Sequence, residues 1–85
     1  MKSTRQVQFS DLRRLLTNLG FVERTTESAV VFNHPKEGLV VFRRYADDES
    51  VSEGDVRSTR RFLDMRGLYA SEDFDGFVEK ATTPA

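Results

Sequence analysis

The sequence of 85 residues contains no cysteine and a single histidine, His34. The absence of cysteine excludes disulfides, thiolate zinc sites and a cysteine nucleophile, and one histidine cannot form a histidine-based metal cluster within one chain. The longest apolar stretches, residues 29–32 and 39–42, are each four residues long, which is far too short to cross a membrane. The N-terminus has no apolar segment of the kind found in signal peptides. We therefore expect a soluble, cytoplasmic protein with no membrane partner.

The sequence also lacks the common motifs of catalysis and cofactor binding. Its five glycines are isolated, so no glycine-rich loop can cradle a phosphate, and no serine has the sequence context of a nucleophile. Residues 71–76 resemble the start of a calcium loop, but the first ligand position is Ser71 and the twelfth is Thr82, so a helix start explains them better. A chain this short cannot enclose a large active site. We expect no cofactor, no metal and no small-molecule substrate.

Charge is distributed unevenly along the chain, although the net charge is only −1. Residues 1–46 carry eight basic and four acidic side chains, whereas residues 47–85 carry five basic and ten acidic ones. Ten of the thirteen basic residues are arginine, which forms bidentate contacts with phosphate and carboxylate groups. This asymmetry is consistent with a basic surface in the first half, and equally with an ordinary solvated surface of mixed charge.

The spacing of apolar residues predicts one helix followed by three strands. Four leucines between residues 12 and 19 recur at helical spacing after Ser10, which is a suitable N-cap, and Gly20 is placed to end the helix. Residues 21–25, 28–33 and 39–43 are predicted as strands, with the turn 34–38 between the last two. The short connections favour an antiparallel sheet. The apolar runs of the second and third strands are so continuous that part of the second face of the sheet is expected to be covered as well.

The second half of the chain predicts an acidic loop over residues 47–55, a helix over 55–65 and a short final helix from Ser71. The result is an α+β domain of order α-β-β-β-α with a three-stranded antiparallel sheet and a short C-terminal helix. We predict one domain at residues 10–80, with tails at 1–9 and 81–85. The expected core includes Leu15, Leu16, Val31, Phe42 and Phe62.

The third strand ends in an arginine pair followed by a tyrosine, and alternation along the strand places the two arginines on opposite faces. One interpretation of the arginines is phosphate contact, with the tyrosine stacking on a base or ribose. The other is ion pairing with carboxylates such as Asp47 and Asp48. His34 is most simply interpreted as a turn residue. The predicted RNA-binding residues are Arg13, Arg14, Arg24, Arg43, Arg44 and Tyr45.

Four segments, taken in order, resemble the HicA-like toxin family. They are the helix start and end, from Ser10-Asp11-Leu12 to Leu19-Gly20-Phe21; the strand and turn from Glu27 to Pro35; the helix start Gly54-Asp55-Val56-Arg57-Ser58; and the ending Gly67-Leu68 with Ser71-Glu72-Asp73-Phe74. The resemblance spans residues 9–79. It implies a fold like a double-stranded-RNA-binding domain, cleavage of messenger RNA, and a partner antitoxin.

The sequence departs from this family at the catalytic histidine, since Ala29 occupies the corresponding position. A methyl group cannot transfer a proton, so we lean towards a protein that is not an enzyme. His34 matches the family's second histidine, in the His-Pro turn. We therefore expect a catalytically inactive HicA-like domain that binds RNA or a protein partner. The alternatives are a protein-interaction or homodimerisation module that uses the sheet edge, and an active messenger-RNA interferase with His34 as its acid or base.

Overall fold

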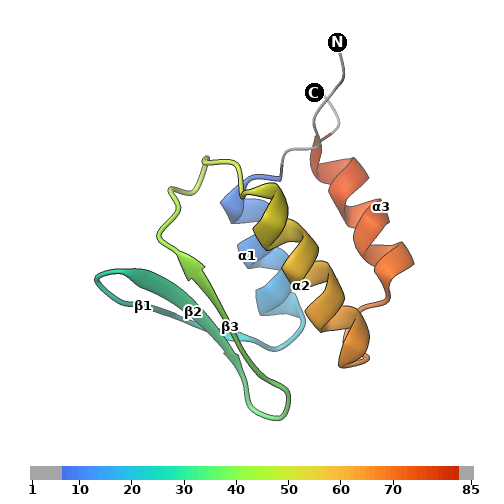
Figure 1. Cartoon of the computed structure of the whole chain (residues 1–85), viewed down its shortest axis with the longest axis horizontal. Coiled ribbons are helices and arrows are strands. Elements are labelled where there is room, and N and C mark those ends of the chain that lie inside the picture. The colour runs from blue at the N-terminus through green and yellow to red at the C-terminus, as the bar shows by residue number, and fades with distance from the viewer. Residues whose placement is uncertain (1–6, 83–85) are drawn as a thin grey trace.

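The computed structural model describes residues 7–82. Three antiparallel strands form a sheet of order β1-β2-β3, followed by two helices and preceded by one (Figure 1). The predicted α+β class and three-stranded antiparallel sheet are therefore confirmed. The elements are α1 (Phe9–Asn18), β1 (Val22–Thr25), β2 (Ala29–His34), β3 (Gly38–Arg43), α2 (Glu53–Met65) and α3 (Ser71–Thr82).

The folded domain begins earlier than the sequence predicted. Val7 and Phe9, which were assigned to an N-terminal tail, are buried, and α1 starts at Phe9. The loop after β3 provides the reason: the carbonyl of Glu49 accepts a hydrogen bond from the Phe9 amide at 2.9 Å, and the carbonyl of Asp47 accepts one from the Ser10 amide at 3.0 Å. These two carbonyls satisfy the first N–H groups of α1, which have no partner within the helix itself, so the helix can begin before Ser10. Residues 1–6 lie outside the described residues.

The core lies between one face of the sheet and the helices. Leu12 and Leu16 of α1 pack against Val30 and Phe32 of β2, and all four side chains are buried. Phe42 of β3 completes this layer, as do Leu15 at its border and other apolar side chains from the loops and the last two helices. Because side chains alternate along a strand, the residues between these face the other side of the sheet.

Two of the predicted core residues are placed differently. The prediction that Val31 is a core residue is wrong. Val31 lies between the inward-facing Val30 and Phe32, so its side chain points to the opposite face of the sheet. Phe62 of α2 is only half-buried, and its ring lies 6.3 Å from that of Phe21 at the border of the core. The fully buried residues of α2 are Thr59 and Leu63, which precede and follow Phe62 in the helix.

Both later helices are longer than the sequence predicted. α2 begins at Glu53, because the hydroxyl of Ser52 accepts a hydrogen bond from the Asp55 amide at 3.2 Å and caps the helix two residues earlier. α3 continues through Thr82 and Ala81 is half-buried, so this part of the predicted C-terminal tail is helical. Residues 83–85 lie outside the described residues. Within residues 7–82, no helix has the length and apolar character needed to cross a membrane.

Candidate interaction surface

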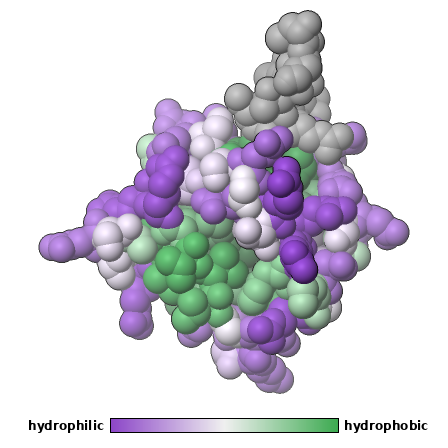
Figure 2. All heavy atoms as spheres, in the orientation of Figure 1, coloured by the Kyte–Doolittle hydropathy of each residue, from purple (hydrophilic) through white to green (hydrophobic). Residues whose placement is uncertain are grey.

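Among the helices of residues 7–82, none covers the second face of the sheet. The pairing register places Val22 of β1, Val31 of β2, and Leu39 and Val41 of β3 together on this face. Val22 is 65% exposed, Leu39 55% and Val41 52%, which places them among the most exposed large apolar side chains of residues 7–82. Figure 2 shows hydrophobic side chains gathered over the part of the molecule where Figure 1 shows the strands. We call this surface the open face.

The open face contradicts one expectation from the sequence. The continuous apolar runs of β2 and β3 predicted cover on both faces, since strands of this kind are typical of sheets buried on both sides. Among residues 7–82, the helices cover one face only. The second apolar face therefore exists, but this part of the chain provides nothing to bury it.

A hollow of about 280 Å³ lies on the open face. Apolar side chains of all three strands line it, together with Arg24 and Asn33. In the register, Arg24 lies opposite Val31 and Asn33 lies opposite Val22, so the two polar side chains are diagonal neighbours across β1 and β2. A diagonal pair of this kind is within reach of a long side chain such as arginine.

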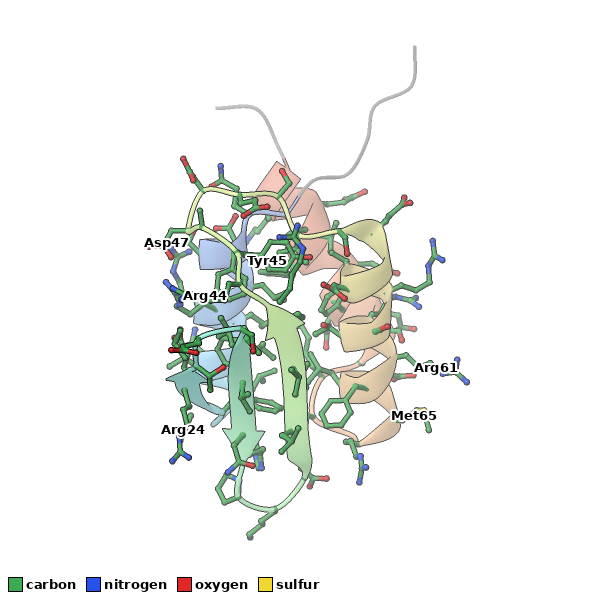
Figure 3. The ribbon with its side chains drawn as sticks, turned by 60° about the vertical axis from the view of Figure 1, so that its left-hand side comes forward. Arg24, Arg44, Tyr45, Asp47, Arg61 and Met65 are labelled. Carbon is green, nitrogen blue, oxygen red and sulfur yellow. The ribbon has the colours of Figure 1, made fainter. Side chains whose placement is uncertain are left out.

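The strand residues of the open face include arginine but no residue with a carboxylate. The outward-facing positions of the three strands include Arg24 and Arg43, and none of them is aspartate or glutamate. Arg43 is paired with Glu49 of the following loop at 3.1 Å. Within the described residues, Arg24 has no ion pair. Figure 3 shows its side chain extending outward from β1.

The two predicted RNA-binding arginines of α1 are engaged by carboxylates. Arg13 lies between Glu23 and Asp47: its Nη1 donates a hydrogen bond to the Asp47 carboxylate at 2.7 Å, and its Nε is 3.0 Å from a Glu23 oxygen. That Nε contact is an ion pair without well-aligned hydrogen-bond geometry. Arg14 is exposed and lies 3.6 Å from Asp11 on the same helix. Arg13 thus joins α1, β1 and the acidic loop, which is a structural role.

At the end of β3, the structure separates Arg43, Arg44 and Tyr45. The Tyr45 ring is only 7% exposed, stacks on Phe9 at 5.4 Å, and points into the molecule (Figure 3). Its hydroxyl donates to Asp55 at 2.7 Å and accepts a hydrogen bond from the Ser52 amide at 3.1 Å. Because this ring is part of the core, the prediction that Tyr45 stacks on a base is wrong. The Arg43 guanidinium lies over the tyrosine ring at 4.0 Å, whereas Arg44 is exposed.

His34 closes the turn between β2 and β3. Its Nδ1 accepts hydrogen bonds from the amides of Lys36 at 3.1 Å and Glu37 at 3.3 Å, and its ring packs edge-on against Phe21 at 5.1 Å. Gly20 lies under the ring, where an added Cβ would be 3.3 Å from Nε2. These contacts agree with the interpretation of His34 as a turn residue and occupy the nitrogen that a general base would use.

The acidic loop is tied to the fold rather than open to a cation. Glu49 accepts hydrogen bonds from the Ala46 amide and from Arg43, and these two contacts hold the pKa of its carboxyl below the ordinary value. Asp47 is paired with Arg13, and Asp55 accepts the Tyr45 hydroxyl. Across residues 7–82, no three acidic or histidine side chains converge in a way that could hold a metal ion.

The two edges of the sheet differ in how they are protected. β1 has four residues and carries Glu23 and Arg24, and charges on an edge strand oppose pairing with another strand. β3 has six residues, with four apolar ones in succession between Gly38 and Arg43. No residue of the described chain other than those of β2 forms a backbone hydrogen bond to β3. The β3 edge is therefore the less protected of the two.

The apolar residues of the open face were not predicted as functional candidates, because they carry no charged or catalytic group. The signal was present in the unbroken runs 29–32 and 39–42, which contain more apolar residues than one buried face requires. Comparison with protein-family models, curated proteins and solved structures gives no match to this chain.

Proposed function

We propose that this domain is a non-catalytic binding module that docks a protein partner on its open face. The observation that carries the proposal is the second apolar face of β2 and β3, formed by Val31, Leu39 and Val41 and completed by Val22 of β1. Contiguous exposed apolar surface on a small domain is characteristic of interaction sites. The proposal includes a cytoplasmic location and descent from a HicA-like domain that has lost its activity. The order of the helices and strands supports the HicA-like descent, and Ala29 in place of the catalytic histidine supports the loss of activity.

Protein binding is favoured over RNA binding because most of the predicted RNA-binding residues are already ion-paired or buried within this chain. Arg13 and Arg43 are engaged by carboxylates of the same chain, and Tyr45 is in the core. RNA affinity depends on the number of phosphates that free cations neutralise. Only Arg24 and Arg44 of the six predicted residues are exposed without a carboxylate partner in the described chain, which is too few for strong electrostatic binding.

A pull-down with matched variants tests this proposal. The wild-type protein, the double variant Leu39→Ser with Val41→Ser, and the control Met65→Ser are each used to capture partners from the source cell. Met65 is 73% exposed but lies on α2, away from the open face (Figure 3). We expect a protein that the wild type and the control retain and the double variant loses, with affinity reduced about tenfold to a hundredfold by the lost apolar burial.

Two results would contradict this function. One is a double variant that remains folded by circular dichroism and still captures the same proteins as the wild type. The other is a gel-shift titration in which structured or single-stranded RNA binds tightly at low salt and is released at higher salt, because that dependence is the signature of phosphate neutralisation.

The unprotected β3 edge supports a second candidate, which is pairing between two copies of the chain. An unpaired strand of six residues without an internal charge can add a further strand. Sedimentation of the wild-type protein over a range of concentrations tests this candidate. A dimer would support it, and a monomer at every concentration would refute it.

A further inference from the structure

We infer that the hollow on the open face recognises a carboxylate-bearing segment of a partner protein, with Arg24 and Asn33 as the groups that hold the carboxylate. This inference rests on the proposed function and specifies the chemistry of the partner. The outward-facing strand residues of this face include arginine but no aspartate or glutamate. A partner that covers this face must therefore supply the negative charge.

Arg24 is the residue that most needs a negative charge from the partner. Its neighbours in the hollow are Val22, Val31 and Leu39, so covering the face would remove its guanidinium from water beside apolar side chains. An arginine buried without a counter-charge is strongly unfavourable, whereas an arginine paired with a carboxylate in good geometry is tolerated. Asn33 on the diagonal position adds an amide N–H₂ group, which can donate to the same carboxylate.

A second copy of this chain is disfavoured as the occupant of the open face for the same electrostatic reason. Two copies stacked through their open faces would bring two Arg24 side chains under cover, and neither face would provide a carboxylate for them. The volume of the hollow, about 280 Å³, is sufficient for a side chain of a docked segment.

A helix is a suitable form for this segment. The opposite face of the same sheet is already covered by α1, whose Leu12 and Leu16 lie on one apolar stripe. A helix with a comparable stripe and with carboxylates at its border would bury the apolar side chains of the open face and reach Arg24. The partner is therefore expected to present an acidic, amphipathic segment.

Three synthetic helical peptides provide the test. They share one leucine stripe and differ only at the border positions, which carry glutamate, glutamine or lysine. Binding is followed through the amide resonances of the full-length protein. We expect the glutamate peptide to shift the resonances of Val22, Arg24, Val31 and Leu39, and to bind at least about tenfold more tightly than the glutamine peptide.

Reversing the charge of Arg24 then distinguishes a role in binding the carboxylate from a role in folding. Arg24→Glu should weaken the glutamate peptide at least about tenfold and should bind the lysine peptide more tightly than the wild type does. The matched control is Arg14→Glu, an exposed arginine of α1, which should leave all three affinities unchanged. A purely structural role of Arg24 cannot produce the gain with lysine.

The possible failures are distinguishable from one another. If glutamine and glutamate peptides bind equally at the open face, carboxylate recognition is refuted while the proposed docking function stands. If no peptide shifts these resonances, both are refuted. If the same resonances shift with protein concentration alone, or shift more strongly with RNA than with the glutamate peptide, a second copy or a nucleic acid is the occupant and the inference is overturned.

Discussion

Replacing Phe9 by alanine tests the finding that the N-terminal segment belongs to the core. The Phe9 side chain is fully buried, and its ring lies 6.0 Å from Phe42, 6.1 Å from Phe32 and 5.4 Å from Tyr45. Removing a buried phenylalanine costs about 3–5 kcal/mol, because the transfer free energy is lost and a cavity remains. A chain of this length has a total stability of roughly 4–13 kcal/mol, so the loss is a large share of it.

The assay is urea denaturation followed by far-UV circular dichroism. With an m value of about 1–1.5 kcal/mol/M for a small domain, the midpoint of Phe9→Ala should fall by roughly 2–5 M. Phe9→Leu keeps most of the volume and loses the ring contacts, so a smaller loss of about 1–2 kcal/mol is expected. Phe62→Ala should also cost less than Phe9→Ala, because Phe62 is only half-buried.

The order of the stability losses of these variants shows whether Phe9 belongs to the core or to a tail. Arg14→Ala serves as the surface control and should change stability by less than about 0.5 kcal/mol. If Phe9→Ala behaves like this control, the segment before Ser10 is a tail, as the sequence predicted, and the described packing of Phe9 is wrong.

Three further outcomes follow from the contacts around the acidic loop and the turn. Tyr45→Phe should lower stability by about 1–3 kcal/mol in urea, because Asp55 and the Ser52 amide lose their shared hydroxyl partner; an unchanged midpoint would show that this network contributes nothing. The pKa of Glu49 is depressed by the Ala46 amide and then by Arg43, so its contribution to stability is present above the unfolded pKa and is lost as pH falls through the folded pKa. An NMR titration should show that depression, and Arg43→Gln should raise the pKa part of the way back. Labelled RNA incubated with the purified protein should remain intact, because the Nδ1 of His34 is occupied by two backbone amides; cleavage that His34→Ala abolishes would refute this.

Local residue chemistry determined the order and type of the elements. The leucines of α1 recur at helical spacing, and Gly20 ends the helix with a φ of +102° that a residue with a side chain rarely adopts. Short connections between apolar runs fixed the antiparallel sheet. These properties depend on residues close together in the chain, so the sequence alone was sufficient to predict them.

Tertiary contacts decided the ends of the elements and the use of each charged side chain. Phe9 joined the core because carbonyls of Asp47 and Glu49, some forty residues later, satisfy the first amides of α1. Tyr45 stacks on Phe9 and bonds to Asp55, and Arg13 is paired with Asp47, through contacts that no local pattern encodes. An arginine or tyrosine has the same local pattern whether it is free for a ligand or held by its own chain.

The open face depends both on the local sequence pattern and on tertiary packing. The sequence contained its apolar residues in two unbroken runs, and alternation along β2 and β3 required that half of them point away from the other half. Only the tertiary structure showed that the helices of residues 7–82 gather on the face of Phe32 and Phe42, because that packing joins residues far apart in the chain. That one-sided packing leaves Leu39 and Val41 exposed to solvent beside Arg24.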